Sequence, residues 1–335
     1  MKRIKFAVVG CGHIGKKHAA IINTHPQAEL TALIDIKDVP ELNLQQFTAP
    51  FFSSVSSFLQ STIETDVMVI ATPNGLHAMQ ATECLKAGKH VVIEKPMALT
   101  TKDANNIIVT ANTYHKNIFV VMQNRYAVPA KWLKEVIDKK LLDEIFSVQL
   151  NCFWNRDERY YKLVNDSAKK DWHGTAALDG GVLFTQFSHF IDIFYWLFGD
   201  IKNIHSRLYS YKRLASFADS GIVTFQFGNN SIGCLNFSTA VWNKNFESSI
   251  TIIAENGTVK IGGQYMDSIE YCHIKDFTMP QLNANDYKNS AANHEHVIQN
   301  VIDALNNKAA INTPANEGLK VVEIIERIYA ASNSV

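Results

Sequence analysis

The segment from Ile4 to Asn23 constrains the fold of this chain more than any other. Its first part, IKFAVV, predicts a buried strand, and its last part, IGKKHAAIIN, has the period of a helix. Gly10, Gly12 and Gly15 stand at the junction in a GxGxxG spacing. Glycines at this spacing allow a tight turn and bring a pyrophosphate close to the N–H groups that begin a helix. The segment therefore predicts the first strand–helix unit of a dinucleotide-binding fold.

Strand and helix signals go on alternating through the first 123 residues. Short apolar runs are typical of parallel strands that are covered on both faces, and helical patterns lie between them. The expected strands after Ile4–Val9 are Leu30–Asp35, Val67–Ala71, His90–Glu94 and Phe119–Met122, and the expected helices are Ile14–Asn23, Leu76–Ala87 and Lys102–Lys116. This alternation predicts a doubly wound parallel sheet.

The rest of the chain has a different pattern, in which strands follow one another with turns such as GNN and ENG between them. The expected strands are Ile145–Phe153, Ile204–Tyr211, Gly221–Phe227, Ser231–Ser238 and Ser248–Ala254, and the expected helices are Val182–Phe198, His294–Asn306 and Glu317–Ala331. We expect an α/β protein with a Rossmann domain at residues 1–123. Residues 124–335 are expected to form an α/β domain with a large open, mostly antiparallel sheet, whose C-terminal helix can pack back on the first domain.

Composition excludes several classes of protein. The chain has 32 basic and 32 acidic residues, so it lacks the excess of positive charge that nucleic-acid binders use. No apolar run is long enough to span a membrane. The five cysteines show no CxxC spacing, and the histidines of His294-Glu295-His296 diverge on a helix, so we expect neither disulfides nor a metal. A cytoplasmic protein is expected.

Asp35 ends the second expected strand, twenty residues after Gly15. A carboxylate at this place accepts hydrogen bonds from the adenine ribose and repels a 2′-phosphate. The sequence therefore favours NAD over NADP, although Lys37 lies near enough to weaken that preference.

The other expected cofactor residues lie where parallel strands end, because ligands of open α/β sheets bind outside the carboxyl ends of strands. His77 could equally be a residue without chemistry at the start of a helix. Besides the three glycines and Asp35, the expected cofactor-binding residues are His13, Ile14, Ile36, Ala71, Thr72, Pro73, Asn74, His77, Glu94, Lys95 and Gln123.

Lys95 follows a core strand and precedes Pro96, which restricts its backbone to extended geometry. A lysine beside oxidised nicotinamide meets a second positive charge, which lowers its pKa. The lower pKa makes the lysine useful in proton transfer. The alternative is a surface lysine in a loop.

A polar stripe interrupts the apolar helix expected at Val182–Phe198. Thr185, Ser188, His189 and Asp192 recur at i, i+3, i+4 and i+7, with Gln186 at the margin. His189 titrates near neutrality and suits a base that accepts a hydroxyl proton, although a lone histidine on such a helix is often only a hydrogen-bonded core residue. We expect Asp192 to orient other groups or to act as a helix partner rather than to catalyse.

Arginine and aromatic side chains could hold an anionic substrate, because guanidinium groups pair with carboxylate and pyrophosphate. The alternative for each arginine, including Arg159, is a solvated surface charge. Trp172 and His173 could contact sugar or only pack a loop. The expected substrate-binding residues are Lys95, Arg125, Tyr126, Arg156, Tyr160, Tyr161, Thr175, Thr185, Gln186 and His189.

Five motifs together resemble the Gfo/Idh/MocA oxidoreductase family: GCGHIG with His18 after it, ATPNGLH, EKPMA, QNRY and DGGxxxxQxSHxxD. The resemblance implies a Rossmann domain followed by a domain whose open sheet mediates dimers or tetramers. It also implies that Lys95 and His189 are catalytic. Many members carry aspartate where this chain has Thr185, so the resemblance leaves the chemistry to Lys95 and His189.

A narrower resemblance runs through NCFWNRDERYY, WHGTAALDGG, QFSHFIDIFYWLFG and SSITIIAENGTVKIGG. These segments are similar to the UDP-N-acetylglucosaminuronate 3-dehydrogenase group. That group uses NAD to oxidise the C3 hydroxyl of a nucleotide-linked sugar for surface polysaccharide. Two alternatives stay open, a dehydrogenase of a free sugar or inositol and a non-catalytic NAD-binding sensor.

Overall fold

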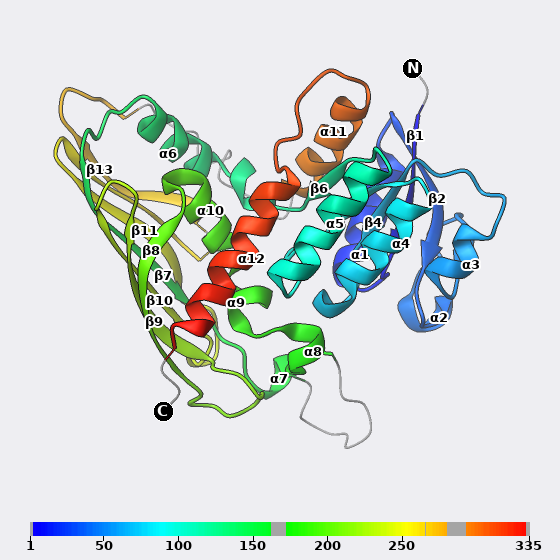
Figure 1. Ribbon diagram of the computed structural model, residues 1–335, viewed down its shortest axis with the longest axis horizontal. Coiled ribbons are helices and arrows are strands. Elements are labelled where there is room, and N and C mark those ends of the chain that lie inside the picture. The colour runs from blue at the N-terminus through cyan, green and yellow to red at the C-terminus, as the bar shows by residue number, and fades with distance from the viewer. Residues whose placement is uncertain (1–2, 162–171, 265, 280–292, 333–335) are drawn as a thin grey trace. The chain divides into compact units, whose positions relative to one another are not determined.

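The structure is a computed structural model that describes residues 3–161, 172–264, 266–279 and 293–332 (Figure 1). The chain forms two compact units. The first holds residues 1–122 and 294–322, and the second holds residues 123–293 and 323–335. The first cut falls beside the expected boundary at residue 123, and the segment 294–322 returns to the first unit.

The sheet of the first unit has six parallel strands. Their order is β3 (Phe51–Phe52), β2 (Ala28–Ile34), β1 (Ile4–Val9), β4 (Val67–Ile70), β5 (His90–Ile93) and β6 (Ile118–Val120). All four residues of β4 are buried, as a strand covered on both faces requires. The expected Rossmann fold is thereby confirmed.

Helices connect these strands (Figure 1). They are α1 (His13–Thr24), α2 (Val39–Leu42), α3 (Val55–Leu59), the 3₁₀ turn η1 (Asn74–Leu76), α4 (His77–Lys86) and α5 (Thr101–Thr113). A further helix, α11 (Asn293–Leu305), follows the strands of the second unit in the chain and belongs to the first unit from residue 294 on. Gly88 follows the end of α4 at a φ of +76°, so it caps that helix in the left-handed conformation that glycine adopts readily. The sequence pattern missed β3, α2 and α3, because elements this short show no periodicity.

The second unit contains a seven-stranded sheet. Its order is β13 (Ser268–Ile274), β12 (Gly257–Gly262), β11 (Glu247–Ala254), β7 (Ile145–Phe153), β10 (Ile232–Ser238), β9 (Ser220–Phe227) and β8 (Ile201–Tyr209). Only β7 and β10 pair in parallel among these neighbours, so the expected mostly antiparallel sheet is confirmed. We did not predict β12, which begins and ends with glycine, or β13, which lies at an edge.

The single helix expected over Val182–Phe198 is wrong. The structure has α9 (Val182–Thr185) and α10 (Ser188–Phe198), with Gln186 and Phe187 between them. The Phe187 N–H bonds the Val182 carbonyl five residues back, which ends α9 before α10 begins. The apolar pattern does not show this break because both pieces are buried.

Further helical segments complete the second unit. They are η2 (Gln123–Tyr126), α6 (Val128–Asp138), α7 (Glu158–Tyr161) and α8 (Ala176–Asp179), and α12 (Ala315–Ala330) begins in the first unit and ends in the second. One face of the sheet packs against α10, where the Phe194 ring lies 5.0 Å from those of Phe225 and Phe227. This aromatic layer fixes α10, and with it His189, on the sheet.

Candidate active site

Each glycine of the first loop has a distinct role. A Cβ on Gly10 would lie 2.6 Å from the Ala71 carbonyl oxygen, and a Cβ on Gly15 would lie 1.7 Å from that of Gly10. A Cβ on Gly12, the residue that precedes α1, meets nothing within 4 Å. The first and third glycines therefore permit close packing, while the backbone at the second stays open. This loop fits a pyrophosphate at the N-terminus of α1.

Asp35 is fixed to the same loop. Its Oδ2 accepts the Cys11 N–H at 2.6 Å and its Oδ1 accepts the Lys37 N–H at 3.0 Å. Burial, with the charge of Asp35, raises the pKa of the Cys11 thiol to about 12, so this cysteine stays protonated. Ile36 is 91% exposed beside them. The carboxylate thus stands at the loop where a ribose is expected.

His77 joins two loops at the carboxyl edge of the parallel sheet. Its Nδ1 lies 2.7 Å from the Pro96 carbonyl oxygen and its Nε2 lies 2.8 Å from that of Thr72. Burial is the larger influence and lowers the pKa of His77, whereas the two carbonyls act to raise it. The ring links the loops after β4 and β5, so its expected contact with the cofactor stays a prediction.

Lys95 lies directly after β5, and its bond to Pro96 is cis. Its N–H donates to Glu94 Oε2 at 3.2 Å, while the residues on both sides of it are buried. Lys95 itself is partly exposed. The lysine side chain therefore starts from a turn whose backbone is held on both sides.

His189 lies in the first turn of α10 and is 8% exposed. Its Nε2 lies 3.2 Å from Gln123 Nε2, which comes from η2. An amide can donate to an unprotonated ring nitrogen or, after half a turn, accept from a protonated one. Gln123 can therefore support the imidazole in both of its protonation states.

A buried ion pair holds η2 against α10. Arg125 donates to Asp192 through Nε at 2.8 Å and through a terminal N–H at 2.5 Å. The two side chains are 5% and 1% exposed, and the guanidinium lies 5.5 Å from the Trp196 ring. Asp192 is thus a helix partner, as expected, whereas the substrate contact expected of Arg125 stays a prediction.

The expected polar stripe is divided by the break between α9 and α10. The Thr185 hydroxyl donates to the Asp179 carbonyl oxygen at 2.9 Å and also to its carboxylate. That carboxylate further accepts the N–H groups of Gly174 at 2.8 Å and Gly181 at 3.3 Å. Asp179 therefore fastens the loop that leads into α9. We did not predict this role, although the DGG motif marked the residue.

Arg156 lies between two aromatic rings. Its guanidinium carbon is 4.9 Å from the Trp154 ring and 4.9 Å from the Tyr160 ring. Gln186 Nε2 donates to the Tyr160 hydroxyl at 2.6 Å. Burial raises the pKa of Tyr160, so the phenol stays a neutral donor. The structure thus brings together three of the expected substrate residues.

Further aromatic residues extend this cluster. The His173 ring stacks on Trp172 at 3.9 Å and lies 4.6 Å from the Tyr160 ring. Tyr161 is buried with its ring 5.1 Å from Tyr160, whereas Thr175 is exposed at the start of α8. Such a cluster offers apolar faces beside a guanidinium.

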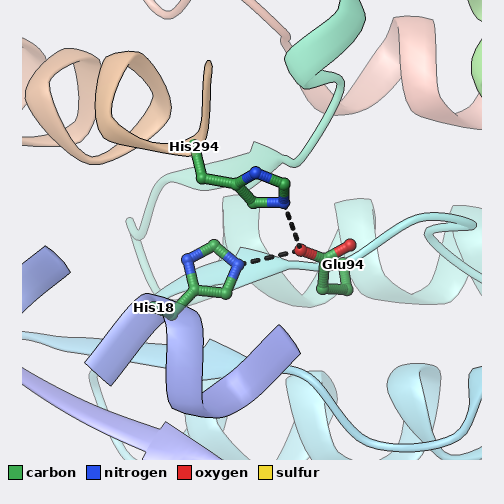
Figure 2. A group of neighbouring side chains, drawn as sticks. All are labelled: His18, Glu94 and His294. Carbon is green, nitrogen blue, oxygen red and sulfur yellow. Dashed lines mark hydrogen bonds and ion pairs between the residues drawn. The ribbon is translucent and has the colours of Figure 1, made fainter. Parts of the chain in front are cut away.

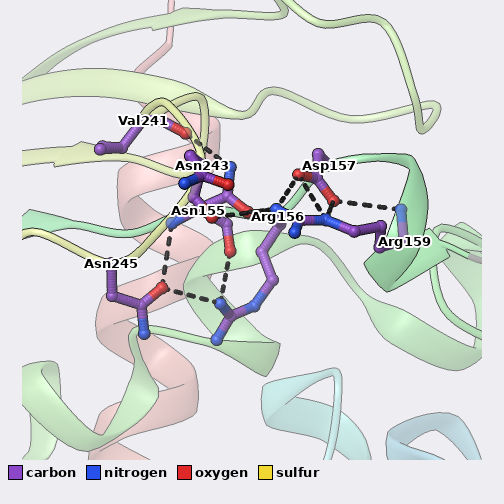
Figure 3. Close-up of polar contacts among 7 residues, drawn as sticks. All are labelled: Asn155, Arg156, Asp157, Arg159, Val241, Asn243 and Asn245. Carbon is purple, nitrogen blue, oxygen red and sulfur yellow. Dashed lines mark hydrogen bonds and ion pairs between the residues drawn. The ribbon is translucent and has the colours of Figure 1, made fainter.

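A polar network fixes the segment after β7 (Figure 3). The Arg156 Nη1 donates to the Asn155 carbonyl oxygen at 2.6 Å and to Asn245 Oδ1 at 3.1 Å. Arg159 pairs with Asp157 and is 64% exposed, which matches the alternative of a surface charge. Both arginines are therefore held by hydrogen bonds, but Arg156 is half-buried between two aromatic rings whereas Arg159 is exposed.

Two family models match the chain. Residues 4–122 match the oxidoreductase family model with an NAD-binding Rossmann fold, and residues 130–260 match the GFO/IDH/MocA C-terminal domain.

Within the described residues, no helix is both long and apolar enough to cross a membrane.

Solved structures resemble the chain over nearly its whole length. The WlbA dehydrogenase of Chromobacterium violaceum, in complex with NADH and UDP-GlcNAcA, is 31% identical with a TM-score of 0.89, covering 99% of this chain and 94% of that one. The WlbA dehydrogenase of Bordetella pertussis, with the same two ligands, is 31% identical with a TM-score of 0.88, covering 99% and 97%.

Curated relatives are more distant. Glucose-6-phosphate 3-dehydrogenase of Bacillus subtilis is 28% identical over 200 residues, which cover 58% of this chain and 53% of that protein. The chain spans about half the length of the first curated relatives it matches.

Proposed function

Because the chain belongs to the Gfo/Idh/MocA oxidoreductase family and carries its NAD-binding Rossmann fold, we propose that it is an NAD-dependent sugar dehydrogenase. The proposed reaction is oxidation of the C3 hydroxyl of UDP-N-acetylglucosaminuronic acid in the synthesis of surface polysaccharide sugars. The observation that carries the proposal is the likeness, over nearly the whole chain, to two dehydrogenases that bind NADH and UDP-GlcNAcA.

The residues of the first unit fit NAD. The open backbone at Gly12 offers N–H donors to a pyrophosphate, and Asp35 offers a carboxylate to the ribose hydroxyls. NAD, when bound, accepts the hydride that leaves the sugar carbon. Position 35 carries a carboxylate and not a basic side chain that could pair with a 2′-phosphate, which supports NAD rather than NADP.

We assign proton transfer to His189. As the hydride leaves, the hydroxyl must lose its proton, and a neutral imidazole can accept it. The Gln123 amide, 3.2 Å from the ring, supports the protonated imidazole that results. Lys95 is assigned to the same oxygen, where an ammonium group stabilises the negative charge that develops.

The substrate side of the proposal rests on the cluster around Arg156. A guanidinium between two aromatic rings suits an anionic group, and the Tyr160 hydroxyl and Gln186 amide suit sugar hydroxyls. We propose that these groups recognise the anionic nucleotide sugar.

A matched set of substrates tests this function. NADH absorbance is followed with UDP-N-acetylglucosaminuronic acid, with the same sugar acid lacking UDP, and with UDP-N-acetylglucosamine, which lacks the carboxylate. We expect kcat/KM for the first to exceed that for the others by about 100-fold or more, because a site built for polar groups discriminates strongly against analogues that lack them.

The other outcomes decide between the alternatives. Equal rates with sugars that lack the nucleotide would favour a free-sugar dehydrogenase, a possibility supported by the likeness to glucose-6-phosphate 3-dehydrogenase. NAD binding without turnover of any of these sugars would favour the sensor.

We also propose that a second copy covers the outer face of the large sheet. Large apolar side chains are exposed on one face of four of its strands: Ile222, Ile232, Ile253 and Tyr271. Exposed apolar surface of this extent is typical of an interface. Light scattering is expected to show a dimer or tetramer for the wild type and a smaller species for Ile222→Glu. A monomeric wild type contradicts the proposal.

A further inference from the structure

The turn that carries Lys95 is held on both sides by buried histidines. Glu94, before the lysine, contacts His18 and His294, and the carbonyl oxygen of Pro96, after it, contacts His77. We propose that these histidines are positioning residues that set the place of the Lys95 side chain. The inference rests on the proposed function only in assigning a reaction role to Lys95.

Two histidines converge on one oxygen of Glu94 (Figure 2). His18 Nε2, from α1, lies 2.8 Å from Glu94 Oε1, and His294 Nε2, from the first turn of α11, lies 3.7 Å from the same oxygen. The His18 and His294 rings meet edge to face at 5.3 Å. Histidines from opposite ends of the sequence therefore clamp one carboxylate.

The clamp is buried and charged. The side chains of His18, His294 and Glu94 are 0%, 4% and 9% exposed. Burial alone raises the pKa of the Glu94 carboxyl, but the hydrogen bond and charge of His18, with His294 and Lys95, lower that pKa to about 2. Glu94 is therefore an anion, and its second oxygen is available to hold the Lys95 backbone.

The link from the clamp to Lys95 is short. Glu94 Oε1 faces the histidines, while Oε2 accepts the Lys95 N–H at 3.2 Å. On the other side, His77 Nδ1 lies 2.7 Å from the Pro96 carbonyl oxygen. Fixed groups on both sides restrict the origin of the flexible lysine, which lowers the entropy lost when its ammonium group is oriented.

The same three side chains could hold a metal ion, since their ligand atoms lie within 4.8 Å of one another. Two features favour a carboxylate that is hydrogen-bonded to His18 and paired with His294 instead. The 2.8 Å separation of His18 and Glu94 is that of a charged hydrogen bond, and His18 Nδ1 has no partner among the described residues, whereas ligand histidines usually donate from that second nitrogen. The charges of Lys17 and Lys95 also act on Glu94 and repel a cation.

A pair of substitutions at one position tests the clamp. His294→Gln keeps an N–H donor near the carboxylate, and His294→Leu removes it at similar volume. His25→Leu is the matched control, because His25 Nε2 bonds Gln299 Oε1 at 2.9 Å and so joins the same two helices without contacting Glu94.

We expect His294→Leu to lower kcat about tenfold or more, with NAD affinity and the sugar KM within about twofold, because a small misplacement of a catalytic group acts on the transition state. His294→Gln is expected to retain kcat within about threefold, as a donor is restored. His25→Leu should behave like the wild type. Wild-type kcat in His294→Leu, or equal losses in the leucine and glutamine variants, overturns the proposal.

Hydrogen exchange gives a readout that needs no turnover. The Lys95 amide should exchange faster in His294→Leu than in the wild type, and at the wild-type rate in His25→Leu. If the Lys95 amide exchanges at the wild-type rate in His294→Leu, the clamp is overturned, even if the wild-type enzyme is active. If exchange is faster in His294→Leu but the wild type turns over none of the sugars, the clamp stands and the proposed function is rejected. Stoichiometric metal in the purified protein, with faster Lys95 exchange after chelation, would replace the clamp by a metal site.

Discussion

Gln123 Nε2 lies 3.2 Å from His189 Nε2. Gln123 belongs to η2, which a buried ion pair fixes to α10, the helix that carries His189. Arg125 follows Gln123 by two residues, and Asp192 follows His189 by three, so these two polar side-chain contacts both join η2 to α10. One contact supplies a polar partner for the proposed base, and the other fixes the distance between the two segments. In this chain, an amide supports the orientation of His189.

Loss of the amide should impair the base. Gln123→Met keeps the length of the side chain and removes its polar atoms, so the protonated imidazole loses a partner. We expect kcat to fall about 10- to 100-fold, in the range of a lost hydrogen bond to a charged group, with sugar KM nearly unchanged. Steady-state kinetics check this, and a kcat within twofold of the wild type would show that Gln123 does not act on His189.

The two proposed catalytic groups should be separable from cofactor binding. Lys95→Met and His189→Asn are each expected to lower kcat by about 10²- to 10⁴-fold, the usual range for a lost acid–base or electrostatic group. NAD affinity, measured by fluorescence titration, should stay within about threefold, because neither side chain is expected to hold the pyrophosphate or adenosine. Near-normal turnover in either variant removes that residue from the mechanism.

The ion pair of Arg125 and Asp192 should matter to stability. Arg125→Met leaves the Asp192 carboxylate buried without its partner, so the free energy of unfolding is expected to fall by about 3 to 5 kcal/mol. The double variant Arg125→Met with Asp192→Leu removes both charges and should recover much of that loss. Urea unfolding measures both. Equal losses in the single and double variants would mean that the pair is not coupled as its geometry indicates.

The charge on Glu94 should make stability depend on pH. The pKa of Glu94 is about 2 in the folded protein, below its ordinary value of 4.5, so ionised Glu94 stabilises the fold above about pH 4.5. That contribution is lost as the pH falls from 4.5 toward 2. The free energy of unfolding of the wild type, relative to that of Glu94→Gln, should therefore fall by on the order of 3 kcal/mol over this pH window. A difference independent of pH between 6 and about 3 would contradict the low pKa.

The sequence predicted the elements whose periodicity is local. Strands β1 and β7 have the expected bounds, because an apolar or alternating run ends at clear turn signals. The glycine loop was predicted for the same reason, since GxGxxG requires particular neighbours on both sides. The edge strand β13 was not predicted, because its residues are nearly all exposed or half-buried and show no alternation between a buried and an exposed face.

Contacts between residues far apart in the chain could not be predicted from the sequence. His294 was considered only with its neighbour His296, and its contact with Glu94 depends on the return of residues 294–322 to the first unit. Arg125 was expected to bind substrate because it is charged, and Asp192 was noted only as part of a helical polar stripe. The sequence did not indicate that the two side chains pair. Local pattern finds reactive groups but does not determine how they pair.

The most direct test of the central claim is the fate of the hydrogen at C3 of the sugar. With UDP-N-acetylglucosaminuronic acid deuterated at C3, we predict that the deuterium is transferred to the nicotinamide, as detected by mass spectrometry of the reduced cofactor. Reduced cofactor without deuterium, or deuterium transferred from a substrate labelled at C4 instead, would contradict the account.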